Sequence, residues 1–310
     1  MAGTIVTGLG GVDPAPSVVS VGFFDGVHRG HQSIIRRAAR AADSRGLRSA
    51  VVTFDRHPME VVNPGSQPRL LMTLARRAQT LAEQGVDLVV VMPFDDELRH
   101  QSPEGFIDHV LTGPLQAERV VVGANFRFGH KAAGDVALLA ELGPGRDFDV
   151  EGVTLLELDG EVISSTEIRT SVDAGRVERA ARLLGRPYLV DGVVVRGDER
   201  GQALGFPTAN LQVSRRVVVP ARGVYAGRCR LPDGTERPCV TNVGVNPTFG
   251  GQDLRVEAHL LDYGGDLYGL SVAVDFRHRI RDEARFDGVE ALVEQIRADV
   301  DTARRLLAES

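Results

Sequence analysis

A change of hydrophobic pattern near residue 185 constrains the fold of this chain more than any other feature. Before it, short apolar runs of strand length alternate with longer segments whose apolar residues recur at helical spacing. After it, valine-rich runs follow one another, separated by turns such as those at 232–234 and 264–266. The first pattern predicts an α/β domain with a parallel sheet, and the second predicts an antiparallel β-barrel or sandwich. With 310 residues available, we expect two domains, 1–185 and 186–310.

The first half contains four predicted strands with helices between them. The strands are the apolar runs at 18–21, 49–54, 87–92 and 119–122. Helical spacing is found at 31–42, 76–84 and 103–111. Because ligands of parallel sheets bind beyond the carboxyl ends of the strands, polar side chains that follow strands should converge at that edge. These side chains are His28, His31, His57 and Asn125. By itself, Asn125 is better explained as a turn residue.

The segment 22–31 (GFFDGVHRGH) joins the first predicted strand to the first predicted helix. Such a junction suits phosphate, because free backbone N–H groups and the helix dipole point at the anion, and Gly22 allows a close approach of the backbone. His28 and His31 are three positions apart, so they share a helix face, and each can donate a hydrogen bond to a phosphate oxygen. The alternatives are two structural histidines or half of a zinc site. Zinc needs three or four ligands, and neither cysteine is near in the sequence.

The composition excludes several functional classes. Lys131 is the only lysine among 36 basic residues, and its surroundings fit neither a P-loop nor a protein kinase, so ATP chemistry must use other groups. A net charge of −6 without a basic block argues against binding to nucleic acid or to an anionic membrane. No apolar run is long enough to span a membrane, and no signal peptide is recognisable. Because Cys229 and Cys239 are too few for a disulfide framework, we predict a cytoplasmic protein.

A second helix N-terminus rich in polar side chains is predicted at residue 164. Ser164 and Glu167 fit a capping box, and the helical pattern continues to about Leu184. An ordinary N-cap is enough to explain this motif. Hydroxyl groups and a guanidinium at a helix N-terminus would also suit a triphosphate. The residues that supply these groups are Ser165, Thr166 and Arg169.

The second half is predicted to be an antiparallel β-barrel with a closing helix. Its strands are expected at 190–195, 217–219, 224–229, 239–243, 256–261 and 272–276. Asp287 and Glu290 fit a capping box, and an amphipathic stripe follows as far as Leu307. The last helix should therefore cover an apolar face of the barrel.

Two groups in this half could carry chemistry. Thr208 and Asn210 alternate by two in the loop 201–210 and could offer oxygen atoms to a hard cation such as Mg²⁺. A plain turn between strands explains them equally well. Glu257 alternates with apolar neighbours, so it is either a surface position of a strand or a carboxylate that faces a cleft as a general base. Periodicity does not decide between these interpretations.

Taken together, these motifs resemble those of one family, the bacterial bifunctional riboflavin kinase/FAD synthetases. The similarity covers nearly the whole chain in the family's order. The His-x-Gly-His loop alone is a weak signal, because many nucleotidylyltransferases and class I tRNA synthetases share it. The Gly-Phe-Pro-Thr-Ala-Asn loop, with Asp-Leu-Tyr-Gly downstream, is a strong one. The matching segments are 22–31, 123–129, 163–169, 204–211, 223–226, 242–244, 246–249 and 266–269.

The resemblance implies a Rossmann-like nucleotidylyltransferase domain followed by a barrel kinase domain. The barrel would phosphorylate riboflavin to FMN with ATP and Mg²⁺, and the first domain would adenylylate FMN with a second ATP, giving FAD and pyrophosphate. It assigns His28 and His31 to the ATP phosphates, Thr208 and Asn210 to Mg-ATP, and Glu257 to the kinase base. Other residues that it assigns to nucleotide binding are Gly22, Phe24, Asn125, Ser165, Thr166, Arg169 and Gly205.

Three positions depart from the family pattern. Phe23 stands where asparagine is common, Arg56 where proline is common, and Val162 where a basic residue often precedes the phosphate element. The alternative functions are a nucleotidylyltransferase for another small phosphate, a flavin-binding regulator with degraded active sites, and a tRNA-binding relative of the class I synthetases. The expected partners are riboflavin, FMN, FAD and ATP, without nucleic acid or membrane, and a homo-oligomer is left open.

Overall fold

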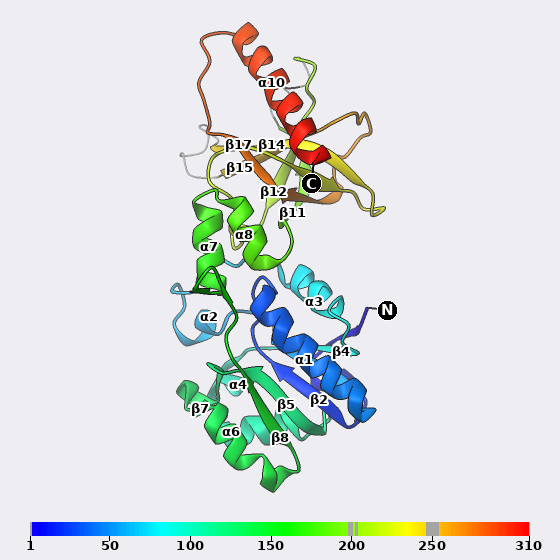
Figure 1. Cartoon of the computed structure of the whole chain (residues 1–310), viewed down its shortest axis with the longest axis vertical. Helices are drawn as coiled ribbons and strands as arrows, with labels where there is room; N and C mark the ends of the chain where they lie inside the picture. Colours follow the sequence, from blue (N-terminus) through cyan, green and yellow to red (C-terminus); the bar gives the residue numbers. More distant parts are fainter. Residues whose placement is uncertain (1, 198–200, 202–203, 246–253, 310) are drawn as a thin grey trace. The chain divides into compact units, whose positions relative to one another are not determined.

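The computed structural model describes residues 2–197, 201, 204–245 and 254–309. Its contacts form two compact units, Met1–Pro68 with Leu74–Ser164 and Arg69–Thr73 with Ser165–Ser310 (Figure 1). The helices that follow residue 164 pack with the second unit, although the sequence pattern assigned them to the N-terminal domain. Residues 202–203 of the loop 201–210 and the motif 246–249 lie outside the described residues.

The first unit is built on a six-stranded parallel sheet with the strand order β1-β4-β3-β2-β5-β8. The four predicted strands form its centre: β2 (Ser17–Val21), β3 (Arg48–Phe54), β4 (Leu88–Met92) and β5 (Ala117–Gly123). The edge strands β1 (Thr4–Thr7) and β8 (Asp149–Val153) were not predicted, because half-exposed strands lack a continuous apolar run. The predicted Rossmann-like architecture is confirmed.

Helices cover both faces of this sheet. The face under α1 (Arg29–Arg45) has a core cluster of its own, in which Ile34 and Ala38 meet Val121. A larger cluster fills the other face beneath α4 (Asp96–His100), α5 (Pro103–Phe106) and α6 (Val136–Leu142). The other helical elements described in this unit are η1 (Leu9–Gly11), α2 (Pro58–Val62), α3 (Leu74–Ala82), the π-helical turn η2 (Ile107–Leu111), η3 (His130–Ala132) and η4 (Pro144–Arg146). Its short strands are β6 (Arg127–Phe128), β7 (Gly134–Asp135), β9 (Glu157–Leu158) and β10 (Glu161–Val162).

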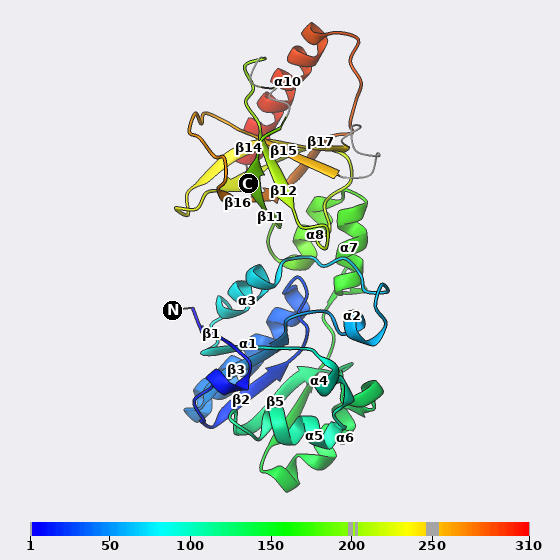
Figure 2. The ribbon, with the colours of Figure 1, turned by 180° about the vertical axis from the view of Figure 1, so that it is seen from behind.

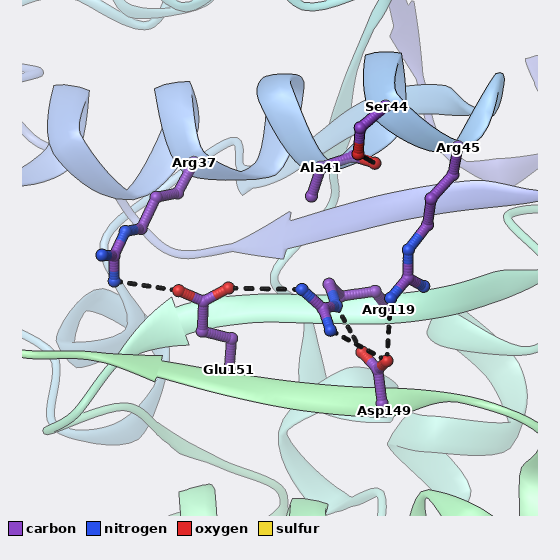
Figure 3. A network of polar contacts seen from close by, with 7 residues as sticks. All are labelled: Arg37, Ala41, Ser44, Arg45, Arg119, Asp149 and Glu151. Atoms are coloured by element: carbon purple, nitrogen blue, oxygen red, sulfur yellow. Dashed lines mark hydrogen bonds and ion pairs between the residues drawn. The ribbon is translucent and has the colours of Figure 1, made fainter.

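Ion pairs connect the edge strand β8 to α1 (Figure 3). Arg37 of α1 reaches Glu151 at 2.9 Å. Asp149 is held from two sides, by Arg45 at 3.0 Å and by Arg119 of β5 at 2.5 Å. Exposed ion pairs contribute little stability each, about 0–1 kcal/mol. Charged side chains on an edge strand also oppose pairing with a foreign strand, so this network keeps β8 as the end of the sheet.

The strand order reverses between β2 and β5. From β2 the chain adds β3 and β4 on one side, and later β5 on the other. Ligands of open parallel sheets bind outside the carboxyl ends of the strands at such a switch point. The segment 22–31 leaves β2 at this place and the segment 123–129 leaves β5. The topology therefore brings two of the predicted motifs to one crevice.

The predicted single helix from 164 to 184 is two helices, α7 (Ser165–Asp173) and α8 (Val177–Leu184). Gly175 separates them with a φ of 69°, a left-handed conformation that favours glycine. A Cβ at this position would lie 2.8 Å from the Tyr225 hydroxyl and would collide with the Arg279 guanidinium. The prediction of a continuous helix is wrong because close packing at Gly175 ends the first helix.

Six antiparallel strands of the second unit close into a barrel. They follow the order β14-β15-β12-β11-β16-β13, and β13 pairs with β14 to complete the ring. Their bounds are β11 (Tyr188–Val195), β12 (Ala209–Val213), β13 (Gly223–Arg230), β14 (Glu236–Val245), β15 (Leu254–Leu260) and β16 (Ser271–Phe276). A further strand, β17 (His278–Arg281), pairs with β13. The predicted barrel is confirmed.

Three details of the predicted second half are wrong. Residues 217–219 form no regular strand: Val217 makes one isolated bridge to Leu70, and these valines are apolar because they are buried. A real strand, β12, begins inside the predicted loop. The closing helix α10 (Val289–Ala308) begins after Gly288, which makes no side-chain cap, so the proposed capping box at 287–290 does not form. α10 itself packs on β13 and β14, as predicted for a helix with one apolar stripe (Figure 2).

Candidate active sites

The phosphate loop, defined as residues 22–31, is shaped by its two histidines. His28 is the N-cap of α1, and its Nδ1 accepts a hydrogen bond from the backbone N–H of His31 at 3.3 Å. The imidazole rings stack with centroids 3.5 Å apart and planes 21° from parallel. The structure thus brings both predicted histidines together at a helix N-terminus. Because His28 Nδ1 accepts, Nε2 carries the proton of the neutral ring and can donate to a ligand.

His31 is neutral at neutral pH. Burial lowers its pKa well below the ordinary value of 6.5, and the neighbouring His28 lowers it further. Its Nδ1 is buried, and none of the described residues forms a hydrogen bond with it. A nearby anion favours the protonated form of an imidazole. His31 is therefore a group that can take up a proton when negative charge arrives.

Gly22 and Phe24 pack against each other at the start of the phosphate loop. A Cβ at Gly22 would come within 2.8 Å of the Phe24 ring, so the close approach requires glycine. The same ring meets His31 edge-on, with centroids 5.2 Å apart. Phe24 and Val27 have φ values of 54° and 41°, and a positive φ is a genuine outlier for a β-branched residue. Backbone strain of this kind concentrates at functional sites.

Asn125 and His57 lie at the same edge of the sheet. Asn125 is exposed in a turn after β5, where the Phe126 N–H donates to the Gly123 carbonyl at 2.9 Å. His57, after β3, is the N-cap of α2, and its ring meets the Phe23 ring with centroids 4.9 Å apart. The carboxyl ends of β2, β3 and β5 therefore all carry polar groups that sequence analysis selected.

A cavity of about 720 Å³ opens at these strand ends, and sequence analysis did not predict it. We call it the aromatic cavity. Segments after β3, β4 and β5 contribute to its lining, so its residues are far apart in the chain; the alternating aromatic residues Phe126 and Phe128 were the available signal. A lining that combines aromatic and basic side chains suits a flat anionic ligand. Its aromatic residues are Phe54, Phe94, Phe106, Phe126 and Phe128, and its basic residues are Arg99, His100, Arg127, His130 and Lys131.

The predicted hydroxyl and guanidinium groups stand at the start of α7, in the second unit. Arg169 Nη2 donates to Thr166 Oγ1 at 3.2 Å, and Ser165 is the first residue of the helix. Glu167 pairs with Arg179 of α8 at 3.0 Å, which joins the two helices. The three predicted residues thus gather at one helix N-terminus, and their approach to the phosphate loop stays a prediction.

Glu257 faces a cavity of about 290 Å³ between the barrel and α10. Strand register sets it opposite Asn210 of β12 on one side and Asn242 of β14 on the other. Opposite residues of neighbouring strands share a face, so a carboxylate stands between two amides. Arg255 Nη1 reaches Glu257 Oε1 at 3.0 Å. The structure therefore favours the cleft-facing interpretation of Glu257, and it adds Asn242, which sequence analysis assigned no role.

Thr208 stands at the border of two cavities. It lines the cavity that contains Glu257 and also a second cavity of about 380 Å³, which includes residues 266–268 of the Asp-Leu-Tyr-Gly motif. Phe206 faces the first cavity, whereas Pro207 and Ala209 face the second. Gly205, exposed with a φ of 84°, turns the chain into this segment. A wall shared by two cavities is the geometry that group transfer between two bound ligands requires.

The residues Thr208 and Asn210 fit a magnesium ion. Asn210 Oδ1 is buried, and it has no hydrogen-bond partner among the described residues. An unsatisfied buried acceptor costs free energy unless a ligand satisfies it, and Mg²⁺ prefers oxygen ligands of this kind. No group of three or more His, Cys, Asp or Glu side chains within the described ranges could hold a metal ion by itself. The ion would therefore depend on substrate phosphate oxygens as well.

The fold and these sites define a class of protein. A glycine-containing loop and helix N-terminus at the switch point of a parallel sheet are typical of nucleotidyl transfer, and a carboxylate in a cavity that adjoins a second one is typical of phosphoryl transfer to an alcohol. One chain contains both. The class is a transferase with two separate sites for ATP chemistry.

Comparisons with known proteins identify the family. A family model described as FAD synthetase matches residues 12–167, and one described as riboflavin kinase matches residues 184–307. The chain is 42% identical to the bifunctional riboflavin kinase/FMN adenylyltransferase of Pseudomonas fluorescens, over 94% of both chains. It is 36% identical to the protein of the same name from Escherichia coli K12, over 97% of this chain and 96% of the other. This chain belongs to the bifunctional riboflavin kinase/FMN adenylyltransferase family.

A solved structure has the same fold over nearly the whole length. It is titled as a macrolide-efflux protein from Streptococcus pneumoniae, with a TM-score of 0.87, 31% sequence identity, and coverage of 98% of this chain and 99% of that one. The family, the fold and both activities predicted from the sequence are confirmed, and the alternative functions are not favoured. The substrates riboflavin, FMN and ATP, and the product FAD, follow from these activities. Within the described residues, no helix has the length and apolarity needed to cross a membrane.

Proposed function

We propose that the sheet edge of the first unit adenylylates FMN and that the barrel phosphorylates riboflavin. The observation that carries this assignment is Glu257, which lies opposite two asparagines in the strand register and lines a cavity that shares Thr208 with a second cavity. The division of the activities at 185/186, expected from the sequence, differs from the packing boundary at 164/165. Under this proposal α7 packs with the barrel unit while its N-terminus serves the adenylylation site.

In the kinase reaction, riboflavin occupies the cavity that contains Glu257, and ATP occupies the cavity beside residues 266–268. The Glu257 carboxylate accepts the proton of the 5′-hydroxyl as that oxygen attacks the γ-phosphorus, and ADP leaves. Asn210 and Asn242 stand opposite Glu257 on the two neighbouring strands, and Arg255 Nη1 donates to its Oε1 at 3.0 Å. Thr208 and Asn210 would hold Mg²⁺, which would offset the negative charge of the phosphates.

In the adenylylation reaction, the isoalloxazine ring of FMN lies in the aromatic cavity, and its phosphate points toward the phosphate loop. The phosphate oxygen attacks the α-phosphorus of ATP and pyrophosphate leaves. The attacking group is already anionic, so this step needs alignment and charge stabilisation rather than a strong base. His28 and His31 donate to the phosphate oxygens, while Asn125 and the α7 N-terminus (Ser165, Thr166 and Arg169) hold the nucleotide.

We infer a cytoplasmic protein without nucleic-acid or membrane partners. The net charge of −6 opposes binding to polyanions. Cys229 and Cys239 are buried free thiols, and burial raises the pKa of Cys229 to about 11, so neither is poised for redox chemistry. The sequence leaves the oligomeric state open, and sedimentation of the purified chain measures it directly.

Product analysis tests the assignment. The purified chain, given riboflavin and ATP, should form FMN and then FAD with Mg²⁺ and neither product in excess EDTA. Phe126→Ser should raise KM for FMN in adenylylation and leave KM for riboflavin unchanged, because Phe126 lines only the aromatic cavity among those described. An unchanged KM for FMN would show that the flavin does not bind in that cavity. Riboflavin phosphorylation in the same sample is the matched control.

A further inference from the structure

One arginine is buried beneath the adenylylation site without an acceptor for most of its N–H groups. Arg77 lies on α3 and is 0% exposed, and it is the largest fully buried side chain among the residues that the structure describes. Its Nη2 donates to the Phe54 carbonyl, whereas Nε and Nη1 have no hydrogen-bond partner among the described residues. A buried guanidinium left partly unsatisfied is costly, so its retention calls for a functional reason.

Within the described part of the chain Arg77 has no direct ion pair, and its charge is balanced by carboxylates at a distance. Burial lowers its pKa to about 10, and attraction to Asp25, Asp55 and Glu60 limits the fall, so the group is a cation at neutral pH. Asp25 belongs to the phosphate loop, and Asp55 follows β3. The Arg77 guanidinium therefore attracts carboxylates that come from separate segments of the chain.

The contacts of Arg77 connect the two halves of the adenylylation site. On one side, the guanidinium carbon lies 4.0 Å from the centroid of the Phe23 ring, which begins the phosphate loop next to Gly22. On the other side, Arg77 binds the carbonyl of Phe54, whose ring lines the aromatic cavity and meets Phe94 edge-on at 5.5 Å. The Phe23 ring also contacts His57, with centroids 4.9 Å apart.

We propose that Arg77 is a positioning residue for FMN adenylylation, and that its guanidinium holds the phosphate loop and the aromatic cavity at the separation that brings ATP and FMN into line. This inference rests on the proposed location of the two substrates. It also gives a role to Phe23, the position where the family pattern commonly has asparagine. An aromatic face can hold a buried guanidinium by cation–π attraction.

The test compares Arg77→Met, Arg77→Lys and Phe23→Leu in the full chain. We expect kcat of adenylylation, normalised to the riboflavin kinase activity of the same preparation, to fall by about 10–100-fold in Arg77→Met, because small misplacement of reacting groups has effects of this size. KM for ATP and for FMN should change much less, since each substrate still has its own half of the site. Arg77→Lys should lose most of the activity, because an ammonium lacks the planar fork. Arg40→Met, at an exposed arginine of α1, is the matched control and should match the wild type.

A double-mutant cycle separates positioning from a general loss of stability. If Phe23 and Arg77 act through their mutual contact, Phe23→Leu with Arg77→Met should be no slower than the slower single variant. Fully multiplicative losses in the double variant, or a wild-type ratio of adenylylation to kinase activity in Arg77→Met, would overturn the inference. If Arg77→Met does not fold, the same measurements of kcat and KM on Arg77→Lys and Phe23→Leu test the inference. Retained adenylylation in a His28→Ala, His31→Ala variant would instead refute the location of the site itself.

Discussion

The two proposed phosphate-handling sites of this chain use opposite architectures. In the first unit, the groups stand on loops beyond the ends of parallel strands, and stacked histidines offer N–H donors. In the second unit, the groups stand on the strands of a closed barrel, and a carboxylate lies between two amides. The nucleophiles of the two proposed reactions account for this difference. The phosphate of FMN is already an anion and needs alignment, whereas the hydroxyl of riboflavin must lose a proton to a base held in place.

The largest effect is expected when both histidines are removed. His28→Ala with His31→Ala should reduce FAD formation at least about 10³-fold, because even one preorganised donor is worth about 10²–10³-fold. Riboflavin phosphorylation by the same preparation should continue at the wild-type rate. The measurement is the separation of FMN and FAD after incubation with riboflavin, ATP and Mg²⁺. A parallel fall in both products would mean that the two sites are not independent.

Removal of the proposed base tests the other side of the comparison. Glu257→Gln keeps the shape of the side chain but removes a usable proton acceptor, so kinase turnover should fall about 10²–10⁴-fold. KM for riboflavin should change little, because the base acts mainly in the transition state. Adenylylation of added FMN is the internal control and should be unaffected. Near-normal kinase turnover would make Glu257 an ordinary strand residue.

Fragments can show how far the two units are independent. α8 packs against β11 and β17 of the barrel unit. Its apolar residues Val177, Leu183 and Leu184 are buried. A fragment of residues 165–310 should therefore be more stable than one of residues 186–310, by at least about 3 kcal/mol. Urea unfolding followed by circular dichroism measures the difference. Equal midpoints would show that α7 and α8 contribute nothing to the barrel.

The smallest expected effect is a pH dependence confined to the first unit. His31 has a lowered pKa in the folded chain, so below about pH 6.5 the unfolded chain binds the proton more readily. The first unit should therefore lose stability as the pH falls below about 6.5, by up to about 1.4 kcal/mol per pH unit from this group. His31→Gln should reduce the slope of stability against pH in the first unit below about pH 6.5. The stability of the barrel should not change with this substitution. An identical slope in the wild type and in His31→Gln would refute the neutral state of His31 in the folded chain.

The sequence predicted the parts of the fold that rest on local pattern. The central strands β2 to β5 and the helix α10 were predictable because they are long, buried or strictly amphipathic. The edge strands β1 and β8, and the break at Gly175, depend on neighbours in space. The same limit applies to the sites: His28 and His31 are adjacent along one helix, whereas Asn242 meets Glu257 only through strand register, and the aromatic cavity collects loops from several strands.

The short segment 69–73 has a consequence for how the two enzymes could ever be separated. It packs with the second unit, although the chain on both sides of it belongs to the first. The Leu70 N–H donates to the Arg216 carbonyl at 2.6 Å, and the Leu70 carbonyl accepts from the Val218 N–H at 2.8 Å. The polypeptide therefore passes between the units three times, after residues 68, 73 and 164. A protease cut near residue 164, or a split of the gene at that point, would therefore leave residues 69–73 on the N-terminal fragment. Because these residues pack with the kinase unit, the two fragments would stay bound to each other.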